Sequence, residues 1–255
     1  MVLFYHRVAD QDLHDWTISN DNFKSQLDYI QANFEVVSLS EAQDRLRRSA
    51  MQKPTVSITF DDGYAENCSQ AIPELLRRKL PFTYFVASEY IRTGEPFPHD
   101  TEIGFSYPPN TVDQLRAMVA AGVEIGCHTR THPNIGEVTD PEQLYDEMVT
   151  SREELANLLG TRIDWFAFPY GQPQHMSAQA FELARRAGYR GVCSAYGGYN
   201  FPGDDSFHLQ RIHGDPGWLR LRNWLSVDPR KLAQVKRCDF PASGEGSACL
   251  EGSRR

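Results

Sequence analysis

The chain has 255 residues, a formal net charge of −8 at pH 7 and a hydrophobic content of 40%, values that are typical of a globular protein with a sizeable core. The acidic balance argues against nucleic acid or an anionic membrane surface as the main partner. No stretch reaches the roughly 18 apolar residues of a membrane-spanning helix.

Two features concern the compartment of the protein. Residues 1–10 lack the charged and apolar regions of a signal peptide, so the sequence predicts a cytoplasmic protein. The five cysteines are odd in number and form no C-x-x-C pair, which is typical of free thiols in a reducing compartment.

Short β-rich runs alternate with amphipathic helical runs along the chain. Strands are expected at residues 2–6, 35–39, 55–60, 82–87, 123–128, 164–171, 189–195 and 208–212. Helices are expected at residues 22–34, 41–50, 64–79, 112–121, 139–160 and 178–187. The expected helix caps are Ser19 or Asn20, Ser40, Thr111, Thr139 or Asp140, and Ser177. The proline-rich residues 92–110 are expected to form a long loop.

This alternation predicts βαβ units and a parallel sheet, hence an α/β fold. About seven strand–helix pairs favour a closed barrel over an open doubly wound sheet. No glycine-rich dinucleotide or phosphate loop follows any strand. The domain is expected to span residues 1–235, and the Gly/Ser-rich residues 239–255 are expected to form a disordered tail.

Polar side chains stand at the ends of several predicted strands. In barrels, functional residues gather at the C-terminal ends of the strands. We therefore expect one rim to carry His6, Asp61, Asp62, His128, His132, Pro169, Tyr170, Arg211, His213 and Asp215.

The adjacent Asp61 and Asp62 pose an electrostatic question, because two carboxylates at one strand end repel each other unless a positive group lies nearby. The spacing H-x-x-x-H places His128 and His132 on one face of a helical turn, a spacing that metal sites use. Two histidines and one carboxylate leave open positions for water or substrate. A divalent cation would neutralise one aspartate and leave the other as a base.

Each pattern also has a simpler interpretation when it is taken alone. H-x-x-x-H in a loop is usually polar surface, and D-D-G is usually a turn. His6 on a strand would be a hydrogen-bonded core histidine. Their joint occurrence at successive strand ends favours the functional interpretation.

The motifs "TFDDG" (59–63), "HTRTH" (128–132) and "FAFPYG" (166–171), in this order and spacing, resemble the polysaccharide deacetylase family, which is the NodB-homology domain or carbohydrate esterase family 4. The resemblance spans roughly residues 1–225. It implies a distorted (β/α)7-type barrel in a single domain. It also implies a metal-dependent hydrolase that removes N-acetyl groups from an amino-sugar oligo- or polysaccharide and releases acetate.

The resemblance assigns roles residue by residue. It makes Asp62, His128 and His132 the ligands of a divalent metal, most commonly zinc, with Co²⁺, Ni²⁺ or Fe²⁺ as alternatives. Asp61 becomes the general base. The backbone N–H of Tyr170 becomes the oxyanion donor, and the turn at Pro169 and Tyr170 shapes one wall of the substrate groove.

The catalytic acid of the family is a histidine in an L-x-x-H motif near the C-terminus. No such motif follows residue 200 here, whereas "LFYH" stands at residues 3–6. The resemblance therefore implies a circular permutation, with His6 as the acid. Such a change is physically cheap because a closed barrel brings its termini together.

Two departures from the family pattern concern the tuning of the catalytic groups. Ala167 stands where the family often has an arginine that holds the catalytic aspartate. Arg211 is the candidate replacement, and the alternative is a surface ion pair of Arg211. Asp215 and Trp218 only loosely match the Asp/Trp pair that orients the acid, and Trp218 is also a candidate for substrate binding.

The same site allows other functions. The substrate could be a non-carbohydrate amide or cyclic imide, or the chain could be a catalytically inactive glycan-binding protein. An aromatic platform for a sugar would come from the set Tyr170, Tyr196, Tyr199, Phe201 and Trp218. The loop at residues 94–100 is expected to shape specificity.

Overall fold

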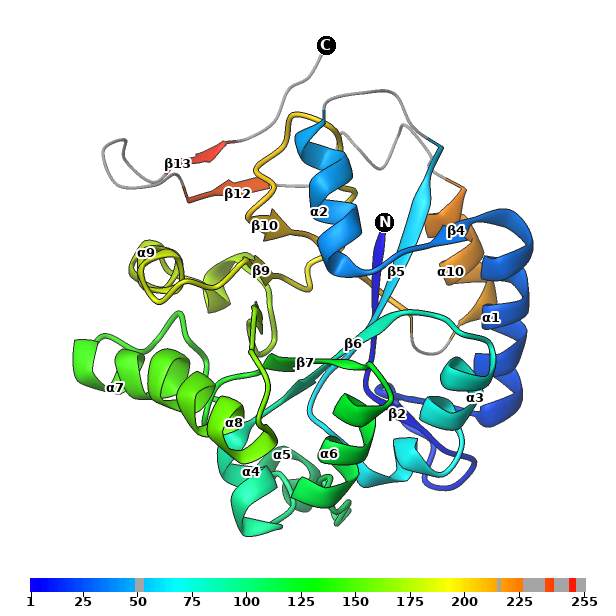
Figure 1. Ribbon diagram of the computed structural model, residues 1–255, viewed down its shortest axis with the longest axis horizontal. Helices are drawn as coiled ribbons and strands as arrows, with labels where there is room; N and C mark the ends of the chain where they lie inside the picture. Colours follow the sequence, from blue (N-terminus) through cyan, green and yellow to red (C-terminus); the bar gives the residue numbers. More distant parts are fainter. Residues whose placement is uncertain (49–52, 215–216, 227–236, 241–247, 251–255) are drawn as a thin grey trace.

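Parallel strands surrounded by helices form the body of the protein (Figure 1). The computed structural model describes residues 1–48, 53–214, 217–226, 237–240 and 248–250. The main sheet consists of β1 (Val2–Tyr5), β4 (Glu35–Val36), β5 (Thr55–Phe60), β6 (Phe82–Val86), β7 (Glu124–Cys127), β8 (Trp165–Ala167), β9 (Gly191–Cys193), β10 (His208–Leu209) and β11 (Arg211–His213).

The strand order closes the sheet almost completely. It runs β10-β9-β8-β7-β6-β5-β1-β11, with β4 also on β5, and every pair in it is parallel. Only Gln210 separates β10 from β11, yet they lie at the two ends of the order. Residues 208–213 therefore act as one broken strand that joins both edges, which confirms the predicted barrel and explains its distortion.

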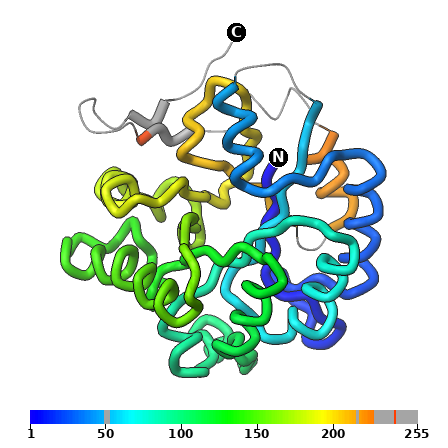
Figure 2. Tube along the Cα trace, in the orientation of Figure 1, coloured from blue at the N-terminus to red at the C-terminus, as the bar shows by residue number. Residues whose placement is uncertain are grey.

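The helices cover the outside of this barrel (Figure 1). They are α1 (Asn20–Asn33), α2 (Leu39–Arg47), α3 (Ala71–Arg77), α4 (Ser88–Thr93), α5 (Pro98–Glu102), α6 (Val112–Ala120), α7 (Pro141–Tyr145), α8 (Ser151–Leu159), α9 (Ala178–Arg186) and α10 (Trp218–Leu225). Short 3-10 turns are η1 (Ala65–Cys68) and η3 (Pro173–His175), and η2 (Asp146–Thr150) is a π-helical turn. Figure 2 shows the orange α10 beside the blue α1.

Side-chain caps fix where several helices begin. Ser19, Asp140 and Ser177 each accept a hydrogen bond from the first turn of the following helix, and Thr111 forms a full capping box with Gln114. The predicted cap Ser40 is wrong, because Ser38 accepts from the backbone of Glu41 and α2 begins earlier.

Three predicted segments differ from the structure. Residues 64–79 form two pieces, η1 and α3, and the Asn67 side chain ties η1 to the barrel, because it accepts from the Val8 N–H and donates to the His6 carbonyl. Residues 92–110 are more ordered than expected, since they include α5 and the end of α4. The predicted helix at 139–160 is interrupted by η2.

Small elements flank the barrel. β2 (Arg7–Val8) pairs with β3 (Thr17–Ile18), and β12 (Arg237–Asp239) pairs antiparallel with β13 (Ala248–Leu250). The predicted disordered tail stays a prediction, because most of residues 239–255 lie outside the described ranges. Within the described ranges, no helix is long and apolar enough to cross a membrane.

Alternation along the strands divides the core into two layers. The inner layer combines side chains from several strands with two from α2, and its members are Val2, Leu39, Leu46, Phe85, Trp165, Ala167, Cys193 and Leu209. The larger cluster joins the outer faces of the strands to the surrounding helices. Apolar side chains thus occupy much of the barrel interior, and functional groups are expected at the C-terminal ends of the strands.

Candidate active site

The turn after β5 separates the two adjacent carboxylates. Asp62 has φ 69° and Gly63 has φ 83°, a left-handed conformation that Asp tolerates and Gly adopts freely. A Cβ on Gly63 would lie 2.8 Å from Cγ1 of Val86, so the turn also needs a glycine for space. The turn directs buried Asp61 and Asp62 toward different partners.

Asp61 is paired with Arg211 inside the barrel. Nη1 of Arg211 donates to Oδ1 of Asp61 at 2.6 Å, and Nη2 donates to Oδ2 at 2.8 Å. Arg211 also donates to Thr59 Oγ1 and to the Ser194 carbonyl, and its guanidinium lies 4.8 Å from the Phe4 ring. A surface pair of Arg211 is therefore wrong, because this side chain has an exposed fraction of 0%.

Arg211 sets the ionisation of the carboxylate that it contacts. Burial by itself would raise the pKa of Asp61, but the charge of Arg211, followed by that of His128, holds this pKa below its usual value. Arg211 thus lies beside Asp61, the position for which it was a candidate in the sequence. Its effect on catalysis stays a prediction.

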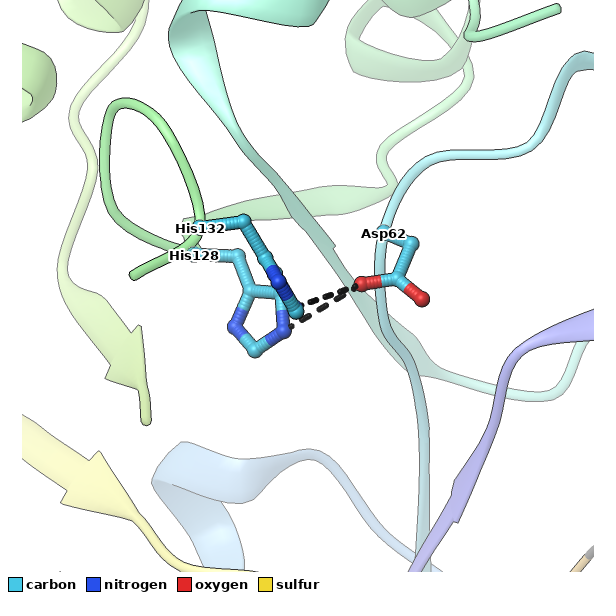
Figure 3. A group of neighbouring side chains, drawn as sticks. All are labelled: Asp62, His128 and His132. Atoms are coloured by element: carbon cyan, nitrogen blue, oxygen red, sulfur yellow. Dashed lines mark ion pairs between the residues drawn. The ribbon is translucent and has the colours of Figure 1, made fainter. Parts of the chain in front are cut away.

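Asp62 faces two imidazoles across a small gap (Figure 3). Its Oδ1 lies 3.4 Å from Nε2 of His128 and 3.2 Å from Nε2 of His132, and one potential ligand atom from each residue lies within 4.8 Å of the others. Burial raises the pKa of Asp62, but without a metal the two imidazoles, when protonated, outweigh burial and hold this pKa well below its usual range. The carboxylate is therefore ionised.

Three observations indicate that this trio fits a metal ion. Nδ1 of His128 lies 2.8 Å from the Ala167 carbonyl, which can only accept a hydrogen bond, so Nδ1 is the protonated atom and Nε2 presents a lone pair. Burial lowers the pKa of His132, which favours the neutral form that ligates metals. Oδ1 of Asp62 is buried without a hydrogen-bond partner among the described residues, so three electron-pair donors face one another, as a divalent cation requires.

The histidines converge through a tight turn, so the predicted helical turn is wrong. Residues 128–132 contain no helix, and Thr129 and His132 have φ 67° and 60°. The buried carboxylate of Glu147, in η2, accepts from the backbone N–H groups of Arg130 and Thr131 at 2.8 and 2.9 Å. A π-helical turn at a functional site is common, and here it positions the loop that carries both histidines.

His6 follows β1 at the same rim. Tyr5 pairs with Phe60 in parallel register, and the Asp61 N–H donates to the Tyr5 carbonyl at 2.8 Å, so His6 and Asp61 follow neighbouring strands side by side. The His6 ring contacts Trp16 at 4.8 Å and His213 at 5.8 Å between ring centroids. The sequence had placed His213 at this rim, whereas Trp16 was missed because it lies in a loop outside every motif.

The aromatic turn after β8 forms another wall. Pro169 is buried, Tyr170 is 52% exposed with φ 59°, and the Tyr170 ring lies 5.2 Å from that of His132. Within the described residues, the backbone N–H of Tyr170 has no hydrogen-bond partner. His99, from the loop expected to shape specificity, lies 5.2 Å from His132 between ring centroids.

Other predicted residues lie elsewhere. The Trp218 ring packs against Tyr29 of α1 at 5.3 Å, and no contact that the structure describes joins it to the rim. Tyr199 and Phe201 line a cavity of about 210 Å³ with Met1 and Thr55, at the opposite end of β1 and β5 from Asp61. Asp215 lies outside the described residues.

Comparisons with known proteins identify a family and several relatives. The family described as polysaccharide deacetylase matches residues 48–192. A chitooligosaccharide deacetylase of Bradyrhizobium is 28% identical over 125 residues, which are 49% of this chain and 45% of that enzyme. The chain thus spans less than half the length of that relative.

Solved structures match over most of the chain. The Streptococcus pyogenes deacetylase PplD, solved in complex with acetate, has 21% sequence identity and a TM-score of 0.73, and the match covers 89% of this chain and 97% of PplD. IcaB from Ammonifex degensii has 26% identity and a TM-score of 0.73, with 89% of this chain and 96% of IcaB covered. The circular permutation implied by "LFYH" stays a prediction.

Proposed function

Because the chain belongs to the polysaccharide deacetylase family, we propose that it is a metal-dependent hydrolase that removes N-acetyl groups from an amino-sugar oligo- or polysaccharide. One observation carries the proposal. A single turn presents a carboxylate held by Arg211 and, next to it, a carboxylate that faces two histidines. The similarity to a chitooligosaccharide deacetylase supports a glycan as the substrate.

The metal would be held by Asp62, His128 and His132. A divalent cation there would act as a Lewis acid that polarises the acetamide carbonyl and lowers the pKa of a nearby water. Zinc suits two imidazoles and one carboxylate with an open position. Co²⁺, Ni²⁺ and Fe²⁺ accept the same donors.

Asp61 would accept the proton of the attacking water. Both of its oxygens contact Arg211, but each carboxylate oxygen has a further lone pair for a water molecule. The guanidinium fixes the plane of the carboxylate and keeps it ionised, so the base is already oriented when the substrate arrives.

The remaining groups would serve the carbonyl oxygen and the leaving nitrogen. The N–H of Tyr170 would donate to the oxygen as negative charge develops there, and loss of one such donor typically costs about 10²–10³ in rate. Protonated His6 would give its proton to the nitrogen as the C–N bond breaks. The products would be acetate and a free amine on the sugar.

Acetate release by the zinc- or cobalt-loaded protein from N-acetylglucosamine oligomers tests this proposal. Asp61→Asn should keep the metal and lose nearly all turnover, and His6→Ala should keep metal and substrate affinity but turn over slowly. An active, fully metallated Asp61→Asn protein would refute the role of the base. Wild-type turnover by His6→Ala would refute the acid and, with it, the permutation.

The same assay also tests the other functions that the sequence allows. A metallated protein that binds the oligomers but releases no acetate would be a glycan-binding protein. One that neither binds nor deacetylates them, but hydrolyses another amide or a cyclic imide, would have a non-carbohydrate substrate.

A further inference from the structure

The loop between β2 and β3, residues 9–16, carries an exposed tryptophan beside the candidate acid. Trp16 has an exposed fraction of 48%. Its ring contacts only His6 and His213 among the ring contacts of the described residues, at 4.8 and 5.0 Å between centroids. A large aromatic side chain with this much area in water is a candidate for binding a ligand.

A buried cation holds this loop in place. Arg7 has an exposed fraction of 1%, and its Nη1 donates to the carbonyls of Gln11 and Asp12 at 3.0 and 3.1 Å. The guanidinium also pairs with Glu66 and lies 3.9 Å from the centre of the Tyr107 ring.

Hydrogen bonds also hold the backbone of Trp16. Its carbonyl accepts from the Arg7 N–H at 3.2 Å, and its N–H donates to Nδ1 of His14 at 3.3 Å. The indole therefore projects from an anchored loop, and a ligand that stacks on it need not order the loop first.

The position of Trp16 indicates which part of a substrate it would meet. His6 follows β1 beside the residue that follows β5, since Tyr5 pairs with Phe60 and the Asp61 N–H donates to the Tyr5 carbonyl at 2.8 Å. Trp16 contacts His6 and has no ring contact with His128 or His132 within the described residues. Trp16 thus borders the rim beside His6 and His213 rather than beside the candidate metal ligands. The reacting acetamide would lie between the ligands and His6, and the next sugar of a chain would extend past His6.

We propose that Trp16 is the stacking platform for the sugar unit next to the one that is deacetylated, so that the protein prefers oligomers to a single sugar. This inference rests on the proposed function. A pyranose ring has a face of C–H groups, and stacking removes this apolar face and the indole from water together. Tryptophan suits the role because it offers a large rigid surface with few rotatable bonds.

The test compares a tetramer of N-acetylglucosamine with the monosaccharide as substrates of the zinc-loaded protein. Trp16→Ala should raise KM for the tetramer about tenfold, which is about 1.4 kcal/mol, with kcat within about twofold. KM for the monosaccharide should not change, and Trp16→Phe should keep most of the tetramer affinity. Tyr145→Ala is the control, because Tyr145 on α7 is an aromatic residue with the same exposed fraction, 48%.

A structural role for Trp16 would give a different result. If the indole only packs against His6, Trp16→Ala will lower kcat equally for both substrates and shift the pH–rate profile, and the platform is overturned. If the wild-type protein releases no acetate, the proposed function is refuted. Calorimetric titration with the tetramer then tests separately whether Trp16 is a stacking platform. Weaker binding by Trp16→Ala would support it, and equal binding or none by the wild type would overturn it.

Discussion

Replacement of Arg211 by methionine is expected to destabilise the protein and to raise the pKa of Asp61, the candidate base. Arg211 and Asp61 are both buried and joined by two hydrogen bonds of 2.6 and 2.8 Å. Removal of one member of such a pair typically costs about 3–5 kcal/mol, because the other charge stays buried without compensation. The charge of Arg211 is the largest cause that lowers the pKa of Asp61, so this pKa should rise in Arg211→Met.

Urea unfolding and a pH–rate profile would measure the two consequences. The acidic limb of kcat/KM should move to higher pH, since Asp61 works as the ionised base. Arg186→Met is the control, because Arg186 makes an exposed ion pair with Glu182 that is worth only about 0.3–0.5 kcal/mol. The double variant Arg211→Met/Asp61→Asn should recover part of the lost stability.

An Arg211→Met protein within about 1 kcal/mol of wild type, with an unmoved acidic limb, would refute this reasoning. The ionisation of Asp61 would then depend on His128 and His6, the other positive groups that lower its pKa.

Three further predictions concern the metal ligands and their support. Glu147→Gln should weaken metal binding about 10–100-fold, because loss of a group that supports metal ligands typically has this effect. An unchanged metal affinity, measured by competition with a chelator, would show that the turn at residues 128–132 keeps its conformation without the Glu147 carboxylate. Asp62→Ala and His128→Ala should each lose stoichiometric metal by elemental analysis, and full metal content in both would exclude this ligand set. The folded-state pKa values of Asp61 and Asp62 lie below the usual 3.8, so their contribution to stability is present above about pH 4 and is lost as the pH falls further. A urea midpoint of the metal-free protein that stays constant between about pH 5 and pH 3 would contradict this.

Much of the barrel could be predicted from local patterns in the sequence. The β-branched run at 55–60 coincides with β5, and Thr111, Asp140 and Ser177 cap helices as predicted. These features depend on neighbours within a few residues, which a sequence pattern reports directly. The predictions failed where distant contacts accompany a change of local structure, as at Asn67, whose side chain is hydrogen-bonded to the backbone of His6 and Val8.

The chemical groups of the candidate site could be identified from the chain alone, because Asp61, Asp62 and the two histidines occur in short motifs at strand ends. The groups that surround them became known from the folded structure. Arg211 meets Asp61 across 150 positions of the chain, and position 167 contributes its carbonyl to His128 rather than a side chain. The physical reason is closure of the barrel, which brings strand ends together in a register that no local periodicity records.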